Sequence, residues 1–590
     1  MNETFEDIIG VMRVEQRFPW KISHLRDHSA ILDGTASPDL VLTDAHYLNS
    51  SLHQWMKGNI WIYQDRIVYA GSSMPEKMNG TEIIQLKDKW IVPGYIEPHV
   101  HPFQLYNPQS FSEYAATRGT TTFIQDNLML LLLCDKKKAL PFMQQFKASP
   151  LNYYWWSRLD SQTELRNEED VFTNGEVLSW LDDPSVLLAG ELTAWPKLAE
   201  GDDLLLSWVQ EARLRYKRVE GHLPGASEKT IAKMTLFGVT GDHESMTGDD
   251  VWKRLEQGLA ATLRHSSIRP DLAKLIRELK EKQLHSFDSL MMTTDGSSPS
   301  FYESGVMDQL IKIAIDEGVE PIEAYHMATY AVAKYYRLDY MQGMIATGRL
   351  ATLNILSDPE NPVPESVMSK GKWIKKDDVV QKQEFEPDWS SIKPLDINWD
   401  IDHDDLQFSM PCGMNMVNNV ITKPYSVSID ASVNELSRDH DESFLMLLDR
   451  HGEWKICTLI KGFASDLGGL ASSFSNTGDI LLIGKSKQDL IDAFNRMKEI
   501  GGGIVLTDKG KRLHEIPLAL GGVMSDQPME TLIEQEKKLR SVLNDCGYDF
   551  DDPVYTLLFL SSTHLPYLRV TQRGIYDVKK KTVLFPTIMR

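Results

Sequence analysis

The sequence predicts an α/β chain centred on a (β/α)8 TIM barrel, with a β-sandwich domain beside it and an α+β domain at the C-terminal end. Between about residues 91 and 340, short apolar runs alternate with helical stretches, and about 250 residues is the usual size of such a barrel. Short alternating apolar runs precede this region and return after it. A chain of 590 residues is also too long for one hydrophobic core.

Changes of pattern along the chain mark the expected domain boundaries. A polar run rich in Lys, Asp and Glu, with Pro387 and Pro394, indicates a connector after the barrel. Farther on, Ser486 is placed to cap a helix that ends at the glycines 501–503. We therefore expect an N-terminal extension at 1–37, a composite β-sandwich from 38–90 plus 341–376, the barrel at 91–340, a connector at 377–418 and the C-terminal domain at 419–590.

The barrel region contains seven apolar runs that we interpret as strands, at residues 91–96, 121–124, 153–156, 186–189, 218–220, 236–239 and 291–294. Two of its helices are also indicated by the sequence. One is capped by Thr247 and buries Leu259 and Leu263 in its last turns, and another runs over 307–317 and stops at Gly318.

The composition excludes several classes of function. With 62 basic and 84 acidic residues the formal charge is −22, which repels nucleic acid and anionic membrane surfaces. The longest apolar run, residues 128–134, is far shorter than the roughly twenty residues that span a bilayer. The four cysteines form no Cys-x-x-Cys pattern, and the N-terminus is acidic where a secretory signal is basic. We expect a cytoplasmic protein with reduced thiols.

Two histidines at the end of an apolar run suggest a metal site. His99 and His101 lie one residue apart, and because side chains alternate along a strand they project to the same side. Neutral imidazole is the commonest protein ligand for divalent transition metals. On its own a His-x-His pair is equally consistent with an ordinary turn.

Further ligand types follow other candidate strands, where a barrel gathers its active site. They are His222, His243, Glu191 and Asp295. Together with the histidine pair they can hold one or two divalent cations, with Glu191 able to bridge two ions, and such ions make water nucleophilic near neutral pH. Asp295 is placed to carry the proton. Asp295 as a plain turn residue and Glu191 as a neighbour of a helix cap remain open alternatives.

The run from Pro93 to His101 resembles the signature of the amidohydrolase superfamily, and the wider match is to its adenine deaminase family. The resemblance extends from about residue 39 to the end of the chain, through the segments 119–122, 190–191, 221–225, 242–244, 294–295, 327–329, 348–351, 501–503 and 518–525, with Arg264 and Ser267.

This resemblance implies a metal-dependent TIM barrel, a composite β-sandwich and an adenine-deaminase-type C-terminal domain. It implies a divalent metal, with Mn²⁺ or Fe²⁺ favoured and Zn²⁺ also suited to mixed His/carboxylate ligation. Asp295 would be the general acid/base, and the metal ligands would be His99, His101, Glu191, His222 and His243.

The chain departs from the family pattern around the expected pocket. At the second strand end the family's His and Glu are replaced within 126–129, and the C-terminal loop 474–479 has no histidine. At the third strand end a small segment is replaced by 155–160, so Trp155 and Arg158 become candidate substrate-binding residues.

The sequence therefore predicts hydrolysis of adenine to hypoxanthine and ammonia, with a small-molecule purine as the partner. The changed pocket segments keep two alternatives open: hydrolysis of another amino-purine or cyclic amide or amidine, and a catalytically silent paralogue that binds metal and purine. Exposed edges of the composite sheet suggest a homodimer.

Overall fold

The computed structural model describes residues 20–134 and 136–590. The expected N-terminal extension lies partly outside these residues, in positions 1–19. Its described part is not irregular, because residues 22–32 form helix α2 (Ile22–Leu32). Ile31 of this helix is buried against Val41, Trp61 and Val68 of the neighbouring sheet. This contact could not be predicted, because Ile31 is the one buried apolar side chain of α2 and no apolar period marks the helix.

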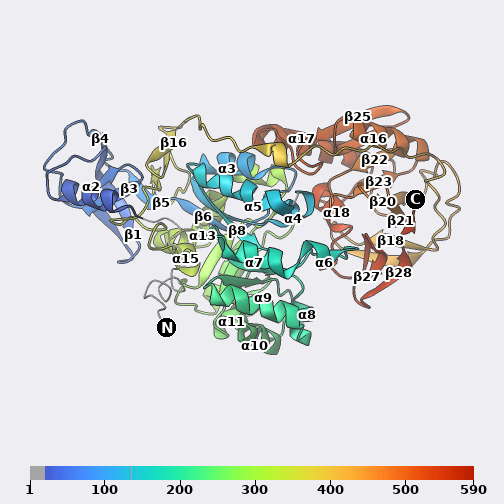
Figure 1. Cartoon of the computed structure of the whole chain (residues 1–590), viewed down its shortest axis with the longest axis horizontal. Coiled ribbons are helices and arrows are strands. Elements are labelled where there is room, and N and C mark those ends of the chain that lie inside the picture. Colours follow the sequence, from blue (N-terminus) through green and yellow to red (C-terminus); the bar gives the residue numbers. More distant parts are fainter. Residues whose placement is uncertain (1–19, 135) are drawn as a thin grey trace, which may run out of the picture.

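Eight parallel strands in sequence order form the barrel at the centre of the molecule, as predicted (Figure 1). The first and last strands are joined by a side-chain contact, since the Thr293 hydroxyl donates to the His99 carbonyl oxygen at 2.6 Å. The strands are β6 (Tyr95–Val100), β7 (Thr120–Gln125), β8 (Asn152–Ser157), β9 (Val186–Leu192), β10 (Arg218–Gly221), β11 (Gly241–Asp242), β12 (Ala260–Arg264) and β13 (Leu290–Thr293).

Helices between the strands cover the outside of the barrel. They bury one apolar stripe each against the strands, which is why their sequences alternate with the apolar runs. The longer ones are α3 (Pro108–Ala116), α5 (Lys136–Gln145), α7 (Asn174–Asp182), α9 (Asp203–Leu214), α10 (Glu228–Phe237), α11 (Gly248–Glu256), α12 (Leu272–Glu281) and α13 (Met307–Asp316).

Three predicted elements of the barrel were wrong in their boundaries. The run 91–96 is split: β5 (Trp90–Pro93) belongs to the composite sheet and β6 to the barrel, with Gly94 between them. The run 236–239 is the end of α10, which stops at Gly238, and the strand that follows has only two residues. The helix capped by Thr247 ends at Glu256, so Leu263 lies in strand β12.

Segments from before and after the barrel share one nine-stranded sheet (Figure 1). Strand β5 pairs with β14 (Leu353–Leu356) in antiparallel fashion, which joins the two segments directly. The other strands are β1 (Leu40–Asn49), β2 (Gln54–Tyr63), β3 (Arg66–Gly71), β4 (Glu82–Gln85), β15 (Ser366–Ser369), β16 (Lys372–Lys376) and β17 (Val379–Val380). The composite sheet domain is thus present.

The C-terminal part forms a second nine-stranded sheet with helices on it, at the opposite end of the molecule from the composite sheet (Figure 1). Its strands are β18 (Cys412–Met416), β19 (Thr422–Ser426), β20 (Glu442–Leu448), β21 (Trp454–Lys461), β22 (Gly469–Ser472), β23 (Ile480–Gly484), β24 (Gly503–Asp508), β25 (Lys511–Pro517) and β29 (Ile588–Met589). The predicted helix is α16 (Lys487–Glu499), and the Ser486 side chain accepts from Asp489 N at its start. A three-stranded sheet of β26 (Leu568–Thr571), β27 (Gly574–Asp577) and β28 (Thr582–Pro586) follows helices α17 (Met529–Asp545) and α18 (Pro553–Phe559).

Residues of the expected connector, 377–418, contribute to the core of the C-terminal part. Leu395, Ile397 and Phe408 are buried in one cluster with Phe494 of α16, and strand β18 already begins at Cys412. Apolar residues spaced irregularly between charges pack on the sheet without forming a regular element. Among the described residues, none of the helices combines the length and the apolar character that crossing a bilayer requires.

Candidate active site

The six predicted site residues meet at the C-terminal ends of the barrel strands. The Asp295 Oδ1 atom lies 3.0 Å from His101 Nε2 and 3.6 Å from His99 Nε2. On the other side, Glu191 Oε1 lies 3.1 Å from His243 Nε2 and also contacts His222 Nδ1. The side chains come from β6, β9, β10, β11 and β13 or the residues directly after them. Their convergence follows from the parallel topology, which brings all strand ends to one face.

Glu191 lies between the two groups of histidines. Its Oε1 atom faces His222 and His243, and its Oε2 atom lies 3.7 Å from His101 Nε2. Two sets of three donors can each surround a cation, with all donor atoms of a set within 4.8 Å of one another: His99, His101 and Asp295 in one, and Glu191, His222 and His243 in the other. The donor sets therefore have room for one or two ions.

The residues fit a divalent cation chemically. His99 is only 1% exposed, yet neither of its ring nitrogens has a hydrogen-bond partner among the described residues. A buried nitrogen without a partner is costly unless a ligand takes it. Burial opposes charge on His101, but hydrogen bonds with Asp126 and Asp295 raise its pKa to about 9. The carboxylates of the site thus favour positive charge beside them. A bound metal ion would supply that charge while its imidazole ligands stay neutral.

Asp126 fixes the orientation of His101. Its Oδ2 atom lies 2.8 Å from His101 Nδ1, so the other ring nitrogen points at Asp295 and Glu191. A carboxylate behind a ligating histidine sets its tautomer and raises its basicity. Burial opposes the charge on Asp126, but Arg158 and His101 lower its pKa. Asp126 takes part in the site through His101, although sequence reasoning assigned it no role.

The guanidinium group of Arg158 contacts Asp126 and Glu191. Its Nε and Nη2 atoms donate to the two oxygens of Asp126 at 2.8 and 2.7 Å, and Nη2 also donates to Glu191 Oε2 at 3.0 Å. The side chain is 1% exposed. The candidate substrate-binding arginine therefore contacts Glu191 and the carboxylate behind His101, and its charge stabilises both in the buried site.

Asp295 is held by a second buried arginine. Arg264 Nε lies 2.9 Å from Asp295 Oδ2, while the Oδ1 atom of the same carboxylate faces the histidine pair. Burial alone would raise the pKa of Asp295, but Arg264 and His101 hold it well below its usual range. Asp295 is therefore ionised at neutral pH and can accept a proton.

Trp155 does not lie at the site. Its side chain is buried on the outside of β8, with its ring 5.7 Å from that of Phe146. The next residue, Trp156, points into the barrel instead, and its ring centroid is 4.1 Å from that of His99. Side chains alternate along β8, so Trp156 and Arg158 share the inner face and Trp155 cannot. The aromatic residue beside the predicted ligands is Trp156.

Two further residues reach the site from segments that sequence reasoning did not connect with it. Gln162, in the loop after β8, donates from Nε2 to Glu191 Oε2 at 2.9 Å. His564, beyond α18 in the C-terminal part, has its ring centroid 5.4 Å from that of His222. Outside the six, the sequence pointed to Arg158 through its departure from the family pattern and to Arg264 through the family resemblance.

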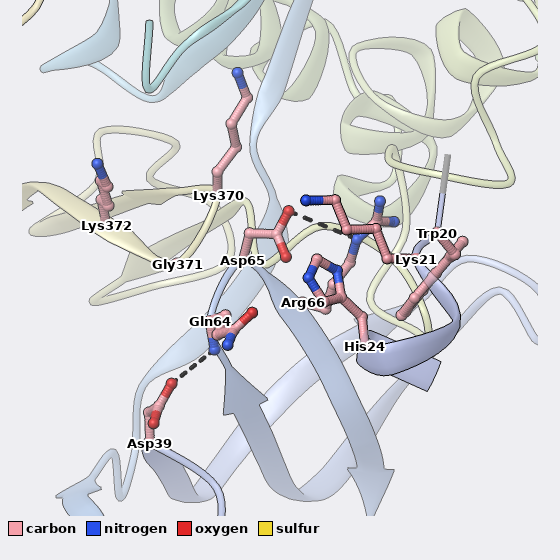
Figure 2. Close-up of a pocket in the computed structure, with 10 residues that line it drawn as sticks. All are labelled: Trp20, Lys21, His24, Asp39, Gln64, Asp65, Arg66, Lys370, Gly371 and Lys372. Atoms are coloured by element: carbon pink, nitrogen blue, oxygen red, sulfur yellow. Dashed lines mark hydrogen bonds and ion pairs between the residues drawn. The ribbon is translucent and has the colours of Figure 1, made fainter. Parts of the chain in front are cut away.

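A pocket of about 660 Å³ lies elsewhere, between α2, the β2–β3 turn and the β15–β16 turn (Figure 2). None of the six site residues lines it. Its lining includes cationic side chains and the carboxylates of Asp39 and Asp65, but Lys370 already donates to the Ser149 and Leu151 carbonyl oxygens. This pocket is therefore separate from the candidate active site.

Comparison with known proteins agrees with the fold. Residues 90–374 match the model of the amidohydrolase family, and residues 419–582 match the adenine deaminase C-terminal domain. A protein of Halalkalibacterium halodurans named "Putative adenine deaminase" is 55% identical over 98% of this chain and 100% of its own length. A Bacillus subtilis protein of the same description is 52% identical over 98% and 100%, and an "Adenine deaminase" of Kosmotoga olearia is 27% identical over 92% and 96%. The chain belongs to the adenine deaminase family of the amidohydrolases.

Proposed function

We propose that this protein catalyses the hydrolytic deamination of adenine to hypoxanthine and ammonia, a reaction of purine salvage. The observation that carries the proposal is the convergence of four imidazoles and two carboxylates at one end of the barrel, with Glu191 between the two groups. Full-length relatives at 50% identity or more bear the name of this activity.

The reaction forms a bond from a water oxygen to C6 of the purine and breaks the bond from C6 to the exocyclic nitrogen. Asp295 takes a proton from the attacking water and delivers it to the departing nitrogen, so the carboxylate is regenerated in each turnover. Arg264 lies 2.9 Å from one oxygen of this carboxylate, and the other oxygen accepts from Gly296 N at 2.7 Å and faces His101 at 3.0 Å. Arg158 and Asp126 keep Glu191 and His101 in place.

A divalent cation held by His99, His101, Glu191, His222 and His243 would supply Lewis acidity, which activates water and offsets negative charge in the transition state. We favour Mn²⁺ or Fe²⁺, with Zn²⁺ as the alternative, because the donor set mixes imidazole and carboxylate. In this assignment each imidazole is neutral and each carboxylate is ionised. Glu191 is ionised, because His222 and Arg158 hold its pKa well below its usual range against the effect of burial.

A second candidate is hydrolysis of another amino-purine or of a cyclic amide or amidine. Trp156 lies against His99 and Arg158 occupies the space beside Glu191, which makes the inner face of β8 bulky next to the ligands. A silent paralogue that binds metal and purine is the alternative from another class, and Asp295 argues against it, since binding alone needs no proton carrier.

We also propose a cytoplasmic location and a homodimer. Cys412, Cys457 and Cys546 form no disulfide in the structure, which suits a reducing compartment. The edge strands β3 and β17 of the composite sheet offer unpaired backbone groups to a second copy. The charge of −22 disfavours nucleic acid as a partner.

The test is product analysis with purified protein that has been stripped of metal and reloaded separately with Mn²⁺, Fe²⁺ or Zn²⁺. We expect ammonia and hypoxanthine in equal amounts from adenine, and none from Asp295→Asn loaded with the same metal. Turnover of 2,6-diaminopurine or a cyclic amide in place of adenine would establish the second candidate. Stoichiometric metal without turnover of any of these compounds would favour the silent paralogue.

A further inference from the structure

The C-terminal part of the chain is attached to the mouth of the barrel beside the candidate active site. Figure 1 shows α18 on the side of the C-terminal sheet that is nearest the barrel. The Tyr555 hydroxyl of this helix donates to the carbonyl oxygen of Gly296, the residue after Asp295. Residues 560–567, which follow the helix, therefore begin next to the site.

Two hydrogen bonds fix this segment to the loop after β8. The Thr163 hydroxyl donates to the Ser561 carbonyl oxygen at 2.6 Å, and Thr563 N donates to the Gln162 carbonyl oxygen at 2.9 Å. Gln162 in turn donates from its side chain to Glu191. The segment is thus positioned by residues that also contact the ligand set, and it brings His564 to a defined place.

His564 lies beside the predicted metal ligands and is not one of them. Its ring stands edge-on to His222, with centroids 5.4 Å apart and an interplanar angle of 82°. It is absent from the groups of described residues whose donor atoms lie close enough to share an ion. Phe559 packs on it at 5.7 Å and 86°, which fixes the plane of the imidazole.

One nitrogen of His564 is available to a ligand. The Nδ1 atom is buried and has no hydrogen-bond partner among the described residues, although the side chain as a whole is only half-buried. A buried polar atom left unpaired costs about 1–3 kcal/mol. A neutral imidazole offers one donor and one acceptor.

We propose that His564, supplied by the C-terminal domain, contacts the substrate and determines its binding by a hydrogen bond to the nitrogen-rich ring of an amino-purine. This inference rests on the proposed function and adds a residue of the C-terminal domain to a site otherwise built by the barrel. Amino-purines carry ring nitrogen acceptors and N–H donors around their edge, so a neutral imidazole matches either kind of group. The C-terminal domain is then a part of the active site and not an accessory.

The test compares His564→Ala and His564→Asn with the wild-type full-length chain, all loaded with Mn²⁺. Loss of one neutral hydrogen bond, worth about 0.5–1.5 kcal/mol, should weaken adenine binding by calorimetry and raise KM roughly 3- to 10-fold, with a smaller change in kcat. Asparagine keeps a donor and an acceptor, so His564→Asn should recover most of the affinity. Metal content per chain should be the same in all three proteins.

The matched control is His514→Ala, because His514 lies in the C-terminal sheet and its Nε2 pairs with the Gln535 carbonyl oxygen at 2.9 Å, without contact to the barrel ligands. Unchanged adenine affinity in His564→Ala would overturn the inference, as would equal losses in the alanine and asparagine variants or a loss of bound metal. If wild type binds adenine without releasing ammonia, the proposed function fails while the binding comparison still tests His564. If wild type does not bind adenine, both fail.

Discussion

Replacing Arg158 with methionine tests the charge balance of the site most sharply. Arg158 is 1% exposed and makes three donor contacts of 2.7–3.0 Å to the carboxylates of Asp126 and Glu191 and a fourth, at 3.0 Å, to the Glu191 carbonyl oxygen. Removing one partner of such a buried group leaves uncompensated charges and costs about 3–5 kcal/mol. For a domain of roughly 250 residues this corresponds to a fall in Tm of about 6–20 °C.

The assay is thermal unfolding monitored by tryptophan fluorescence. A chelator is present so that no bound metal can offset the negative charge of Glu191. Arg277→Met is the matched control, because Arg277 pairs with Glu317 at the surface of the same barrel and is 57% exposed. Such a pair contributes about 0–1 kcal/mol. Adding Asp126→Asn to Arg158→Met should destabilise less than the two single changes added together, since it removes one of the unpaired charges. This reasoning would be refuted if Arg158→Met had the same Tm as the Arg277→Met control.

Three further predictions concern the metal and the pH. Asp126→Asn should weaken metal binding about 10- to 100-fold in competition with a chelator, because His101 loses the carboxylate that orients it. Removing the metal should lower Tm, and Mn²⁺ at about 100 times its Kd should restore about 2.7 kcal/mol; an unchanged Tm would mean that no cation binds the folded site. Burial lowers the pKa of His326 from the 6.5 of the unfolded chain to about 4 in the folded protein. The folded state therefore favours the neutral ring, and this contribution to the free energy of unfolding is complete above pH 6.5 and is lost as the pH falls toward 4. Between pH 6.5 and 4 the free energy of unfolding of the wild type should fall by about 1–3 kcal/mol more than that of His326→Gln, as measured by thermal unfolding. Parallel curves of stability against pH for the two proteins would contradict the assignment.

The parts of the site that sequence analysis found all come from strand ends. His99 and His101 are related by the two-residue period of a strand, and Glu191 and Asp295 each follow an apolar run. Because the strands of the barrel are parallel, their C-terminal ends lie at one face, so residues at these ends are expected to meet there. For this reason the position of all six residues could be predicted, whereas their roles as ligands and proton carrier stay predictions.

The direction of the β8 side chains could not be predicted. All six residues of Asn152–Ser157 are buried, on both faces of the strand, so no alternation of polar and apolar residues shows which face is inside. Trp155 and Trp156 are therefore indistinguishable in sequence. Strand β11 was missed because its two residues are too few to establish a period.

Contacts between segments far apart in the sequence also could not be predicted from local sequence patterns. His564 reaches His222 only because α18 and the loop after it dock on the barrel. The charged composition of 377–418 predicts a connector between domains and does not indicate that Leu395 and Ile397 are buried in the C-terminal core. Neither docking surface has a periodic signature of its own.

The most direct test of the account is to measure bound metal and ammonia release from adenine together, in wild type and in His101→Asn and His222→Asn, which remove one donor from each half of the site. The account predicts that wild type binds metal and releases ammonia, and that both variants lose metal and turnover in parallel. Variants that keep stoichiometric metal and full turnover would show that the chemistry takes place elsewhere and would contradict the account.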